Sequence, residues 1–422
     1  MTDYKFPKSF IFGTAVASYQ VEGGIYNNDW THWENKNNSV CVEPCGDACK
    51  HYEYLDDDIE LLQELGIKAF RFSMEWSRIQ PEKNVFNEDE IKYYVSKAKK
   101  LLSKNIMPII TFHHFTTPDW LAEYGYWASP KTTDAFVLYV SKMMEHLPSE
   151  VIYYNTINEP GIFSMFGYFS KAKFPPGIRN EKVFIAASEN IINAHKKSLK
   201  VIKNKNKKAK VGMTHALHEW DDKDKSIFNK YLKYHLEDKF FFASDEDDFI
   251  GLQTYSIKRT SPNLIYRFFA AVLIKVPFFR NHLFPIFLDT FSGRNDYVPK
   301  SARKTKMGYE YRPEAIKYNL HRIHDKYPEK DIFITENGIA TDNDAERIEF
   351  VKDVLKDIHQ YKQKNDNVIG YLYWSLLDNF EWDLGYNMNF GLVELDRVTY
   401  ERKPHKSAYW FGGVSKTNSF TD

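Results

Sequence analysis

Two glutamates, Glu159 and Glu336, each follow a run of apolar residues, and each has an asparagine as its neighbour. The apolar runs predict buried strands, so each carboxyl group should be partly desolvated where its strand ends. Two facing carboxyl groups are what cleavage of a glycosidic bond requires, because one protonates the departing oxygen while the other attacks the anomeric carbon or activates water. Capping of a strand end, or pairing with a structural arginine, is the alternative for either glutamate alone. The two together favour glycosidic bond cleavage.

Short apolar runs recur along the chain and alternate with helical patterns. Continuous apolar strands of this kind are typical of parallel sheets that are covered on both faces. A helix is predicted over residues 55–65, where apolar residues fall on one face and Gly66 provides the stop. Similar repeats predict helices over residues 91–102, 136–147 and 348–358. The eight predicted strands are residues 9–13, 68–72, 107–112, 151–157, 209–213, 248–252, 331–335 and 368–374.

Eight strands that alternate with helices over 422 residues predict a single (β/α)8 TIM barrel, with residues 1–422 forming one catalytic domain. No linker rich in Pro, Gly or Ser divides the chain. A doubly wound open sheet is the alternative, and it predicts a phosphate-binding turn of the form G-x-G-x-x-G after the first strand. Residues 14–20 read TAVASYQ and do not match that turn. The barrel is therefore the favoured fold.

In a barrel of this kind, the functional side chains lie at the carboxyl ends of the strands. Those positions hold polar and aromatic residues from six strands, which should converge on one mouth. Arg71 is expected to hold an ionised carboxylate and to lower its pKa, and Tyr255 is expected to donate a hydrogen bond to that carboxylate. The other candidates are Gln20, His114, Asn158 and Glu381 as partners of sugar hydroxyls, and Trp374 and Trp382 as flat faces for a pyranose ring. Packing in the core is the alternative for the histidine and for each tryptophan.

The composition narrows the classes of function. The 57 Lys and Arg residues balance the 57 Asp and Glu residues, and this zero net charge excludes a basic nucleic-acid binder as judged from bulk charge. Apolar residues make up 43% and charged residues 27%, which is typical of a globular protein. A mean hydropathy of −0.53 excludes a polytopic membrane protein. The first residues show no secretion signal, so a cytoplasmic location is expected.

The three cysteines, Cys41, Cys45 and Cys49, lie within one short stretch. An odd number of cysteines confined to one loop is a poor disulfide framework. A metal site that includes His51 is one interpretation, but the spacing differs from that of common zinc sites, which use closer pairs in two clusters. Free thiols packed in a loop are favoured, and no metal site is predicted.

Six short motifs occur in order along the chain. They are FGTA at 12–15 with Gln20 and EG at 22–23; RFS at 71–73 with EWSR at 75–78; TINEP at 156–160; ITENG at 334–338; WSL at 374–376 with DNFEW at 378–382; and RKP at 402–404 with SA at 407–408. Any one motif is moderately specific, whereas all six in this order are highly specific. Through them the chain resembles glycoside hydrolase family 1, the β-glucosidase and β-galactosidase family, from about Phe6 to Phe411, and most of all its compact archaeal members.

The resemblance implies a role for each candidate residue. Glu159 would be the general acid/base and Glu336 the nucleophile, and Tyr255 stands where the family has a tyrosine that contacts the nucleophile. Asn158 would bind the 2-hydroxyl, and Trp374 would form the floor beneath the sugar. The residues that would bind the remaining hydroxyls of the non-reducing sugar are Gln20, His114, Glu381 and Trp382.

The enzyme implied by the resemblance is a retaining β-glycosidase that releases terminal non-reducing β-D-glucosyl or β-D-galactosyl residues through a covalent glycosyl-enzyme. Its substrate would be a small β-glycoside or a short β-linked oligosaccharide, and no cofactor, metal or nucleic acid is expected. A non-catalytic sugar- or partner-binding barrel is the main alternative, and loss of either carboxylate would have indicated it. A barrel aldolase or phosphate-using isomerase is a second alternative, but no lysine stands at the strand ends and residues 336–339 lack a Gly-rich phosphate nest.

The chain departs from the family pattern at several places. Phe115 stands where a tryptophan often follows the sugar-binding histidine, and residues 387–389 read NMN in place of the common basic residues. Residues 253–254 read QT where the family usually has Asn-Tyr. Phospho-sugar members usually carry a serine where Glu381 stands, so the carboxylate found here would repel a phosphate and favours unphosphorylated sugars.

A hydrophobic stretch from Leu264 to Leu288 lies within a loop insertion at about residues 261–300 and belongs to none of the motifs. Interspersed basic residues and Pro277 make it a poor membrane-spanning helix. Because it follows the sixth strand, it should lie at the mouth of the barrel. The favoured interpretation is a lid or a wall on the aglycone side, which would select alkyl or aryl glycosides. An oligomer contact and a membrane-surface patch, which would add peripheral membrane association to the cytoplasmic location, are the alternatives.

Overall fold

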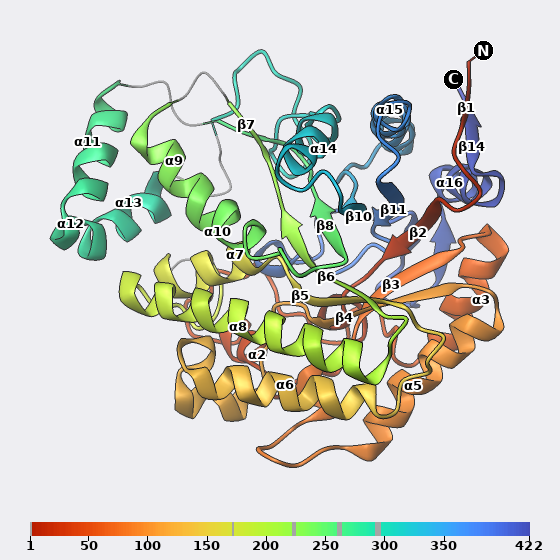
Figure 1. The fold of residues 1–422 in the computed structure, drawn as a ribbon, viewed down its shortest axis with the longest axis horizontal. Helices are drawn as coiled ribbons and strands as arrows, with labels where there is room; N and C mark the ends of the chain where they lie inside the picture. Colours follow the sequence, from red (N-terminus) through yellow and green to blue (C-terminus); the bar gives the residue numbers. More distant parts are fainter. Residues whose placement is uncertain (1, 171–172, 222–224, 260–263, 292–296) are drawn as a thin grey trace.

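The chain folds into a closed barrel of eight parallel strands (Figure 1). This computed structural model describes residues 2–170, 173–221, 225–259, 264–291 and 297–422. Around the barrel the strands follow one another in the order of the sequence and close between the last strand and the first. Their bounds are β2 (Ile11–Ala15), β3 (Ala69–Ser73), β4 (Met107–His113), β5 (Tyr153–Asn158), β6 (Lys210–Ala216), β8 (Phe249–Gln253), β10 (Asp331–Asn337) and β11 (Val368–Trp374).

The structure confirms the (β/α)8 barrel, and each predicted strand begins within two residues of an observed one. The strands are buried on both sides, as their continuous apolar sequences require; every residue of β3, for example, is buried. Side chains that point inward fill the barrel interior, among them Ala69, Ile109 and Phe333. A larger apolar core lies between the strands and the surrounding helices.

Helices cover the outside of the barrel, and the four predicted from apolar repeats are observed as α3, α5, α6 and α15. Gly66 ends the first of them in a left-handed conformation, with φ of 83°. The helices are α1 (Ser18–Val21), α2 (Asp29–Glu34), α3 (Leu55–Leu65), α4 (Trp76–Ile79), α5 (Glu88–Ser103), α6 (Pro130–Met144), α7 (Pro160–Ser164), α8 (Glu181–Lys205), α9 (Ile227–Lys233), α10 (Lys239–Phe241), α14 (Ala315–Lys326), α15 (Asp344–Lys362) and α16 (Lys406–Thr417).

Short paired strands and short helical segments lie outside the eight barrel strands. Three small two-stranded sheets pair β1 (Asp3–Lys5) with β14 (Ser419–Thr421), β7 (Glu219–Trp220) with β9 (Ile257–Lys258), and β12 (Val393–Leu395) with β13 (Arg402–Pro404). Short 3₁₀ helices are η1 (Asp119–Tyr124), η2 (Tyr126–Ala128) and η5 (Trp382–Leu384), and short π-helices are η3 (Met165–Phe169) and η4 (Tyr234–Asp238). Of these, η3 and η5 matter most here because they contribute residues to the pocket described below.

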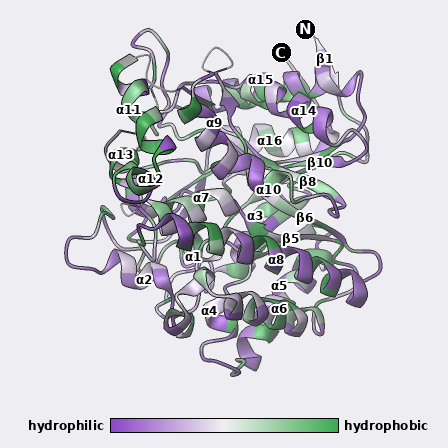
Figure 2. Ribbon diagram, turned by 60° about the vertical axis from the view of Figure 1, so that its left-hand side comes forward, coloured by the Kyte–Doolittle hydropathy of each residue, from purple (hydrophilic) through white to green (hydrophobic). Residues whose placement is uncertain are grey.

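The loop insertion folds into three helices, α11 (Leu264–Lys275), α12 (Pro277–His282) and α13 (Phe284–Phe291), which we call the α11–α13 unit. The unit stands beside α9 at one side of the barrel (Figure 1), and hydrophobic residues colour much of it (Figure 2). Phe284 anchors the unit, because its ring lies 5.3 Å from that of Tyr231 in α9 and 5.9 Å from that of Phe169 in η3. Neither these helices nor any other in the described part of the chain is long and apolar enough to cross a membrane.

Cys45 and Cys49 are free thiols, as the sequence suggested. The thiol of Cys45 donates to the carbonyl of Tyr19 at 3.1 Å, and the thiol of Cys49 donates to the carbonyl of Asp378 at 3.2 Å. Burial raises the pKa of both thiols, so both remain protonated. They therefore act as small packing groups with local hydrogen bonds.

Candidate active site

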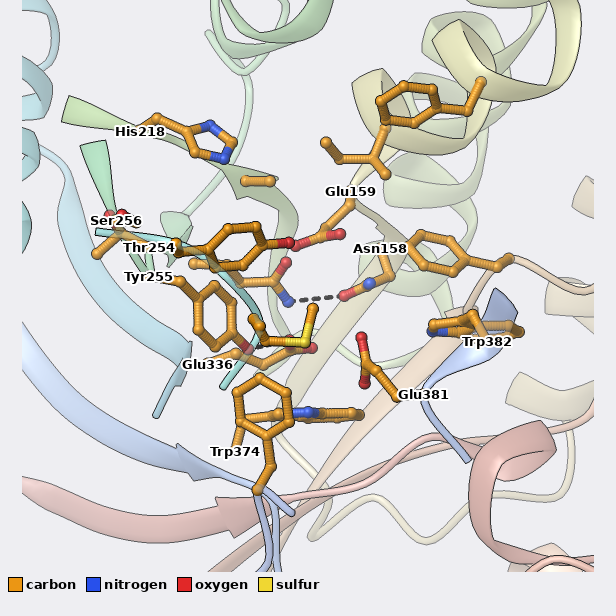
Figure 3. Close-up of a pocket in the computed structure, with 18 of the residues that line it drawn as sticks. Asn158, Glu159, His218, Thr254, Tyr255, Ser256, Glu336, Trp374, Glu381 and Trp382 are labelled. Carbon is orange, nitrogen blue, oxygen red and sulfur yellow. Dashed lines mark hydrogen bonds between the residues drawn. The ribbon is translucent and has the colours of Figure 1, made fainter. Parts of the chain in front are cut away.

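A pocket opens at the carboxyl ends of the barrel strands, with an empty volume of about 1140 Å³ including its open mouth (Figure 3). Nine of the ten predicted site residues line it: Gln20, His114, Asn158, Glu159, Tyr255, Glu336, Trp374, Glu381 and Trp382. The tenth, Arg71, is buried and forms an ion pair with Glu336. The structure therefore brings together all ten residues, although they are spread over more than 360 positions of the chain.

Glu159 stands between β5 and α7 in a left-handed backbone conformation, with φ of 43°. Its amide donates to the carbonyl of Thr214 in β6 at 2.9 Å, and the pairing of β5 with β6 changes register between Asn155 and Asn158. Successive side chains of a regular strand point to opposite faces, but this irregular backbone lets both Asn158 and Glu159 face the pocket. Figure 3 shows the two side chains pointing into the same space.

The carboxyl group of Glu159 is in an environment that favours its neutral form. It keeps some contact with the space of the pocket, but protein atoms enclose it on the other sides. This enclosure, together with the nearby negative charge of Glu336, raises the pKa of Glu159 well above its usual value, and Arg71 opposes the rise only in part. A carboxyl group with a raised pKa stays protonated near neutral pH and can donate its proton.

Glu336 lies in β10, is buried, and accepts two hydrogen bonds. The hydroxyl of Tyr255 donates to Oε2 at 2.9 Å, and Nη1 of Arg71 donates to Oε1. Burial raises the pKa of Glu336, whereas Arg71 and Tyr255 hold that rise back because they stabilise the ionised form. The negative charge of Glu336, in contrast, raises the pKa of Glu159. Of the two coupled groups, Glu336 is therefore the first to lose its proton as pH rises.

The carboxamide of Asn158 is held in one orientation by four neighbours, one of which is the hydroxyl of Thr214, which donates to Oδ1 at 3.4 Å. The Oδ1 of Asn158 also accepts from Nη2 of Arg71 at 2.6 Å and from Nε2 of Gln253 at 2.7 Å (dashed line in Figure 3). Its Nδ2 lies 3.2 Å from Nε2 of His114. Because the oxygen already has three donors, Asn158 presents its N–H side to a ligand. Arg71 thus contacts both Asn158 and Glu336, and Gln253, one of the departures from the family pattern, supports the same network.

His114 is neutral and belongs to a group of nearly parallel rings. Burial, with the charges of Arg71 and His113, holds the pKa of His114 well below its usual value. Its ring lies 5.9 Å from that of Trp374 with 20° between the planes, and 6.2 Å from that of Trp382 with 16° between the planes. Flat apolar faces and a neutral imidazole suit a ligand that carries both C–H surfaces and hydroxyl groups.

The side-chain oxygens of two buried glutamines, Gln20 and Gln253, accept no hydrogen bond among the described residues. Nε2 of Gln20 donates to Oδ1 of Asn379 at 3.1 Å and to the carbonyl of Phe380 at 2.7 Å, while its Oε1 has no hydrogen-bond partner among the described residues. Oε1 of Gln253 is in the same state. A buried acceptor without a partner is unfavourable, so these two oxygens are suited to accept hydrogen bonds from a bound ligand.

One side of the pocket is an apolar wall that was not predicted from the sequence. The wall consists of Phe115, which follows β4, and of Ile162, Phe166 and Phe174, from α7, η3 and the segment after them. The rings of Phe166 and Phe174 lie 5.8 Å apart, and those of Phe115 and Phe174 lie 5.4 Å apart. The rule about strand ends could have found Phe115, two residues beyond β4, but not Phe166 or Phe174, which lie well beyond β5. The other lining residues that were not predicted are Lys173, Ala216, His218, Gln253, Thr254, Ser256, Lys258, Met307, Tyr309 and Phe390.

The α11–α13 unit does not form this wall. Among the described residues, those that line the pocket include none from α11, α12 or α13. The favoured interpretation of residues 264–288 as a wall on the aglycone side is therefore wrong for this pocket. The reason is that Phe284 packs against Phe169 of η3, whereas Phe166 of the same turn faces the pocket, so η3 stands between the unit and the ligand space.

A barrel whose mouth holds two carboxyl groups, one buried and one open to the pocket, surrounded by aromatic rings and amides, defines a sugar-cleaving class of enzyme. The model of glycosyl hydrolase family 1 matches residues 2–244 and 223–420. Beta-glucosidase A from Acetivibrio thermocellus is 32% identical and is covered in full, as is this chain. A 6-phospho-beta-galactosidase from Staphylococcus epidermidis is 28% identical, with 98% of each chain covered. The solved structure of a beta-glycosidase from Pyrococcus horikoshii is 31% identical, with a TM-score of 0.85 over 100% of this chain and 97% of that one.

The chain belongs to glycosyl hydrolase family 1. It is therefore a glycoside hydrolase of the β-glycosidase type, and its substrate is a small glycoside. The resemblance based on the six motifs is confirmed, and the aldolase and isomerase alternatives are excluded.

Proposed function

We propose that the protein is a retaining β-glycosidase that removes terminal non-reducing β-D-glucosyl or β-D-galactosyl residues, with Glu336 as the nucleophile and Glu159 as the general acid/base. The observation that carries the proposal is the contrast between two carboxyl groups in one pocket. Glu336 accepts hydrogen bonds from Arg71 and Tyr255, whereas Glu159 is enclosed beside the charge of Glu336. Environments that push two pKa values apart suit one group to attack and the other to donate a proton.

The reaction takes two displacements at the anomeric carbon. First, the ionised carboxylate of Glu336 forms an ester bond with that carbon, the bond to the leaving oxygen breaks, and this oxygen takes the proton of Glu159. Second, Glu159 removes a proton from water, the water oxygen bonds to the anomeric carbon, and Glu336 leaves as a carboxylate. The charge of Glu336 disappears in the ester, which removes one cause of the raised pKa of Glu159 and favours its role as a base. Two inversions give net retention.

Recognition of the terminal sugar is assigned to the amides and rings of the pocket. The N–H group of Asn158 would bind the 2-hydroxyl, and Trp374 would lie beneath the ring. Oε1 of Gln20 would accept from a hydroxyl on the far side of the sugar, because it lacks any other donor among the described residues. The remaining contacts would come from His114, Glu381 and Trp382. Because a glutamine and a carboxylate can serve either epimer at position 4, both glucosides and galactosides are included.

We propose that the sugar is unphosphorylated, although one relative is named a 6-phospho-beta-galactosidase. Glu381 lines the pocket and adds negative charge near Glu159. A phosphate on the sugar would meet this carboxylate and be repelled. On the aglycone side, the wall of Phe115, Ile162, Phe166 and Phe174 supports a preference for alkyl or aryl groups.

A panel of glycosides tests this proposal. We expect release of nitrophenol from nitrophenyl β-glucosides and β-galactosides in buffer that contains a chelator. Octyl glucoside should be hydrolysed about tenfold faster than methyl glucoside, or faster still, because the apolar wall binds the longer alkyl chain. The 6-phosphorylated aryl galactoside should be a poor substrate, and the α-anomers should not react. Preference for the phosphorylated sugar would contradict the assignment of Glu381, and equal rates for octyl and methyl glucoside would count against the apolar wall.

The dependence of kcat/KM on pH should be bell-shaped. The rate falls as pH drops through the pKa of Glu336, because the protonated form cannot attack, and it falls as pH rises through the pKa of Glu159, because the ionised form has no proton to give. Tyr255→Phe removes a hydrogen bond that lowers the pKa of Glu336, so its acid limb should move to higher pH. Initial rates measured across a series of buffers report both limbs.

Tyr327→Phe is the matched control for that pH experiment. Its hydroxyl donates to the carbonyl of Phe241 at 3.1 Å, outside the pocket, so the variant should keep the wild-type profile. Movement of the acid limb to lower pH in Tyr255→Phe would contradict the assignment of Glu336 as the ionised nucleophile.

We further propose that residues 1–422 act as one catalytic unit in the cytoplasm. Residues from Gln20 to Trp382 meet in one pocket, which supports a single unit. The free thiols of Cys45 and Cys49 suit a reducing compartment. Among the described residues, those of the α11–α13 unit lie outside the pocket.

A further inference from the structure

The α11–α13 unit concentrates exposed apolar side chains. Four phenylalanines have exposed side chains in the described part of the chain, and three belong to this unit: Phe268 (66% exposed), Phe269 (56%) and Phe278 (65%). Val276 and Leu283 of the unit are exposed as well. Single exposed apolar residues are ordinary in proteins, but a cluster of this size on one element marks a surface that binds something.

Helix α11 is apolar on two sides, and only one of them is covered. On the covered side, Ala270 and Ile274 are buried, and the ring of Tyr266 lies 5.7 Å from that of Phe228 in α9. On the other side, Phe268 and Phe269 are exposed. A helix that is apolar all round is normally buried, because its outer side otherwise keeps apolar surface in contact with water. The outer side of α11 therefore calls for a partner that is itself apolar.

The charge of the unit selects among such partners. The α11–α13 unit contains three Arg and Lys residues and one acidic residue, Asp289, so its net charge is +2 in a chain whose net charge is zero. One of the three, Arg280, pairs with Glu181, whereas Lys275 is exposed. A second copy related by a twofold axis would bring two basic patches face to face. An anionic lipid surface instead accepts aromatic rings at its interface and attracts basic side chains.

We propose that the α11–α13 unit docks the protein onto the surface of an anionic lipid membrane. The unit would lie in the interface, since its helices are only 12, 6 and 8 residues long and cannot span a bilayer. Phe268, Phe269 and Phe278 insert among the lipids, and Lys275 stays at the level of the headgroups. Docking by this surface is a binding property that holds whether or not the proposed hydrolysis does.

Co-sedimentation of the full chain with vesicles tests the proposal. We expect the protein to bind vesicles in which about a third of the lipid is phosphatidylserine, more weakly at high salt, and to bind pure phosphatidylcholine less. The triple variant Phe268→Ser, Phe269→Ser and Phe278→Ser should partition about tenfold less or weaker still, because three rings no longer leave water. Lys275→Glu should weaken binding to the anionic vesicles several-fold.

Phe242→Ser provides the matched control, because Phe242 is the fourth exposed phenylalanine and lies outside the unit. Its binding to vesicles should equal that of the wild type, and all variants should hydrolyse nitrophenyl glucoside at the wild-type rate in the absence of lipid, which shows that they fold. Failure of the wild type to sediment with anionic vesicles, or equal binding by the triple variant, overturns the proposal. So does a wild-type dimer in analytical ultracentrifugation that the triple variant converts to a monomer, because a second copy would then cover the surface.

Discussion

Replacing Glu336 by glycine is expected to lower turnover by a factor of about 10⁵ or more, because no other group can form the glycosyl ester. In the proposed mechanism the space that the side chain leaves would lie beneath the anomeric carbon, so added azide or formate should enter it and attack from the side of the missing nucleophile. With azide this single displacement yields an α-glycosyl azide, whose configuration NMR spectroscopy of the product identifies. Recovery of turnover together with inversion would place the nucleophile at this position.

The isosteric variant Glu336→Gln distinguishes loss of the nucleophile from the opening of a cavity that an anion can enter. Its amide oxygen can still accept from Arg71, while its amide N–H group faces the hydroxyl of Tyr255, which can turn to accept. The side chain leaves no room for an anion, so the variant should be inactive and should not be rescued. Thermal unfolding of both variants beside the wild type distinguishes a loss of chemistry from a loss of folding. Wild-type turnover in Glu336→Gly, or a β-configured azide product, would remove Glu336 from the mechanism.

Replacing Glu159 by alanine should have an effect that depends on the leaving group. Alkyl glucosides should be hydrolysed about 10³-fold more slowly or worse, because an alkoxide leaves only when it is protonated. Dinitrophenyl glucosides need no proton, so they should form the ester rapidly and then stall, since no base activates the water. Rapid-mixing measurements should show a burst of dinitrophenol, and azide should accelerate the slow step and give a product of retained configuration.

Glu159→Gln is the matched variant for this experiment, because it keeps the size of the side chain while removing the proton donor. Its alkaline limb should vanish from the pH profile of nitrophenyl glucoside hydrolysis, since this poorer leaving group still takes a proton and that limb reports the pKa of Glu159. An equal loss of activity for alkyl and dinitrophenyl glucosides would contradict a role in proton transfer and would assign Glu159 to substrate binding instead.

The fold and the meeting of the ten candidate residues at one pocket could be predicted because their signals are local in the sequence. The strands of the barrel are short continuous apolar runs, and the residue after each run falls at the mouth by the geometry of the fold. Glu159, directly after β5, and Glu336, near the end of β10, obey this rule, as does Tyr255 just beyond β8. Arg71 could be assigned to a carboxylate for the same reason, because β3 delivers it to the same end of the barrel.

The walls of the pocket could not be predicted in the same way, because their signals depend on packing. Phe166 and Phe174 look like ordinary core aromatics, and only the turn of η3 after α7 decides that they face the ligand space. The stretch from Leu264 to Leu288 was assigned to the pocket from its place in the sequence. Packing of Phe284 against α9 and η3 holds this stretch outside the pocket instead. Such a long-range contact cannot be predicted from a local sequence pattern.

The left-handed backbone at Glu159 bears on how this barrel can change over time. The turn comes from the junction of β5 with α7 and from the amide hydrogen bond to Thr214, and neither depends on the carboxyl group. A descendant that exchanged the glutamate for another unbranched residue would keep the bend, the aromatic floor and the locked amide of Asn158. If the proposed roles hold, such a chain would still bind sugars but would hydrolyse alkyl glycosides far more slowly, so one amino-acid substitution separates the proposed enzyme from a sugar-binding protein.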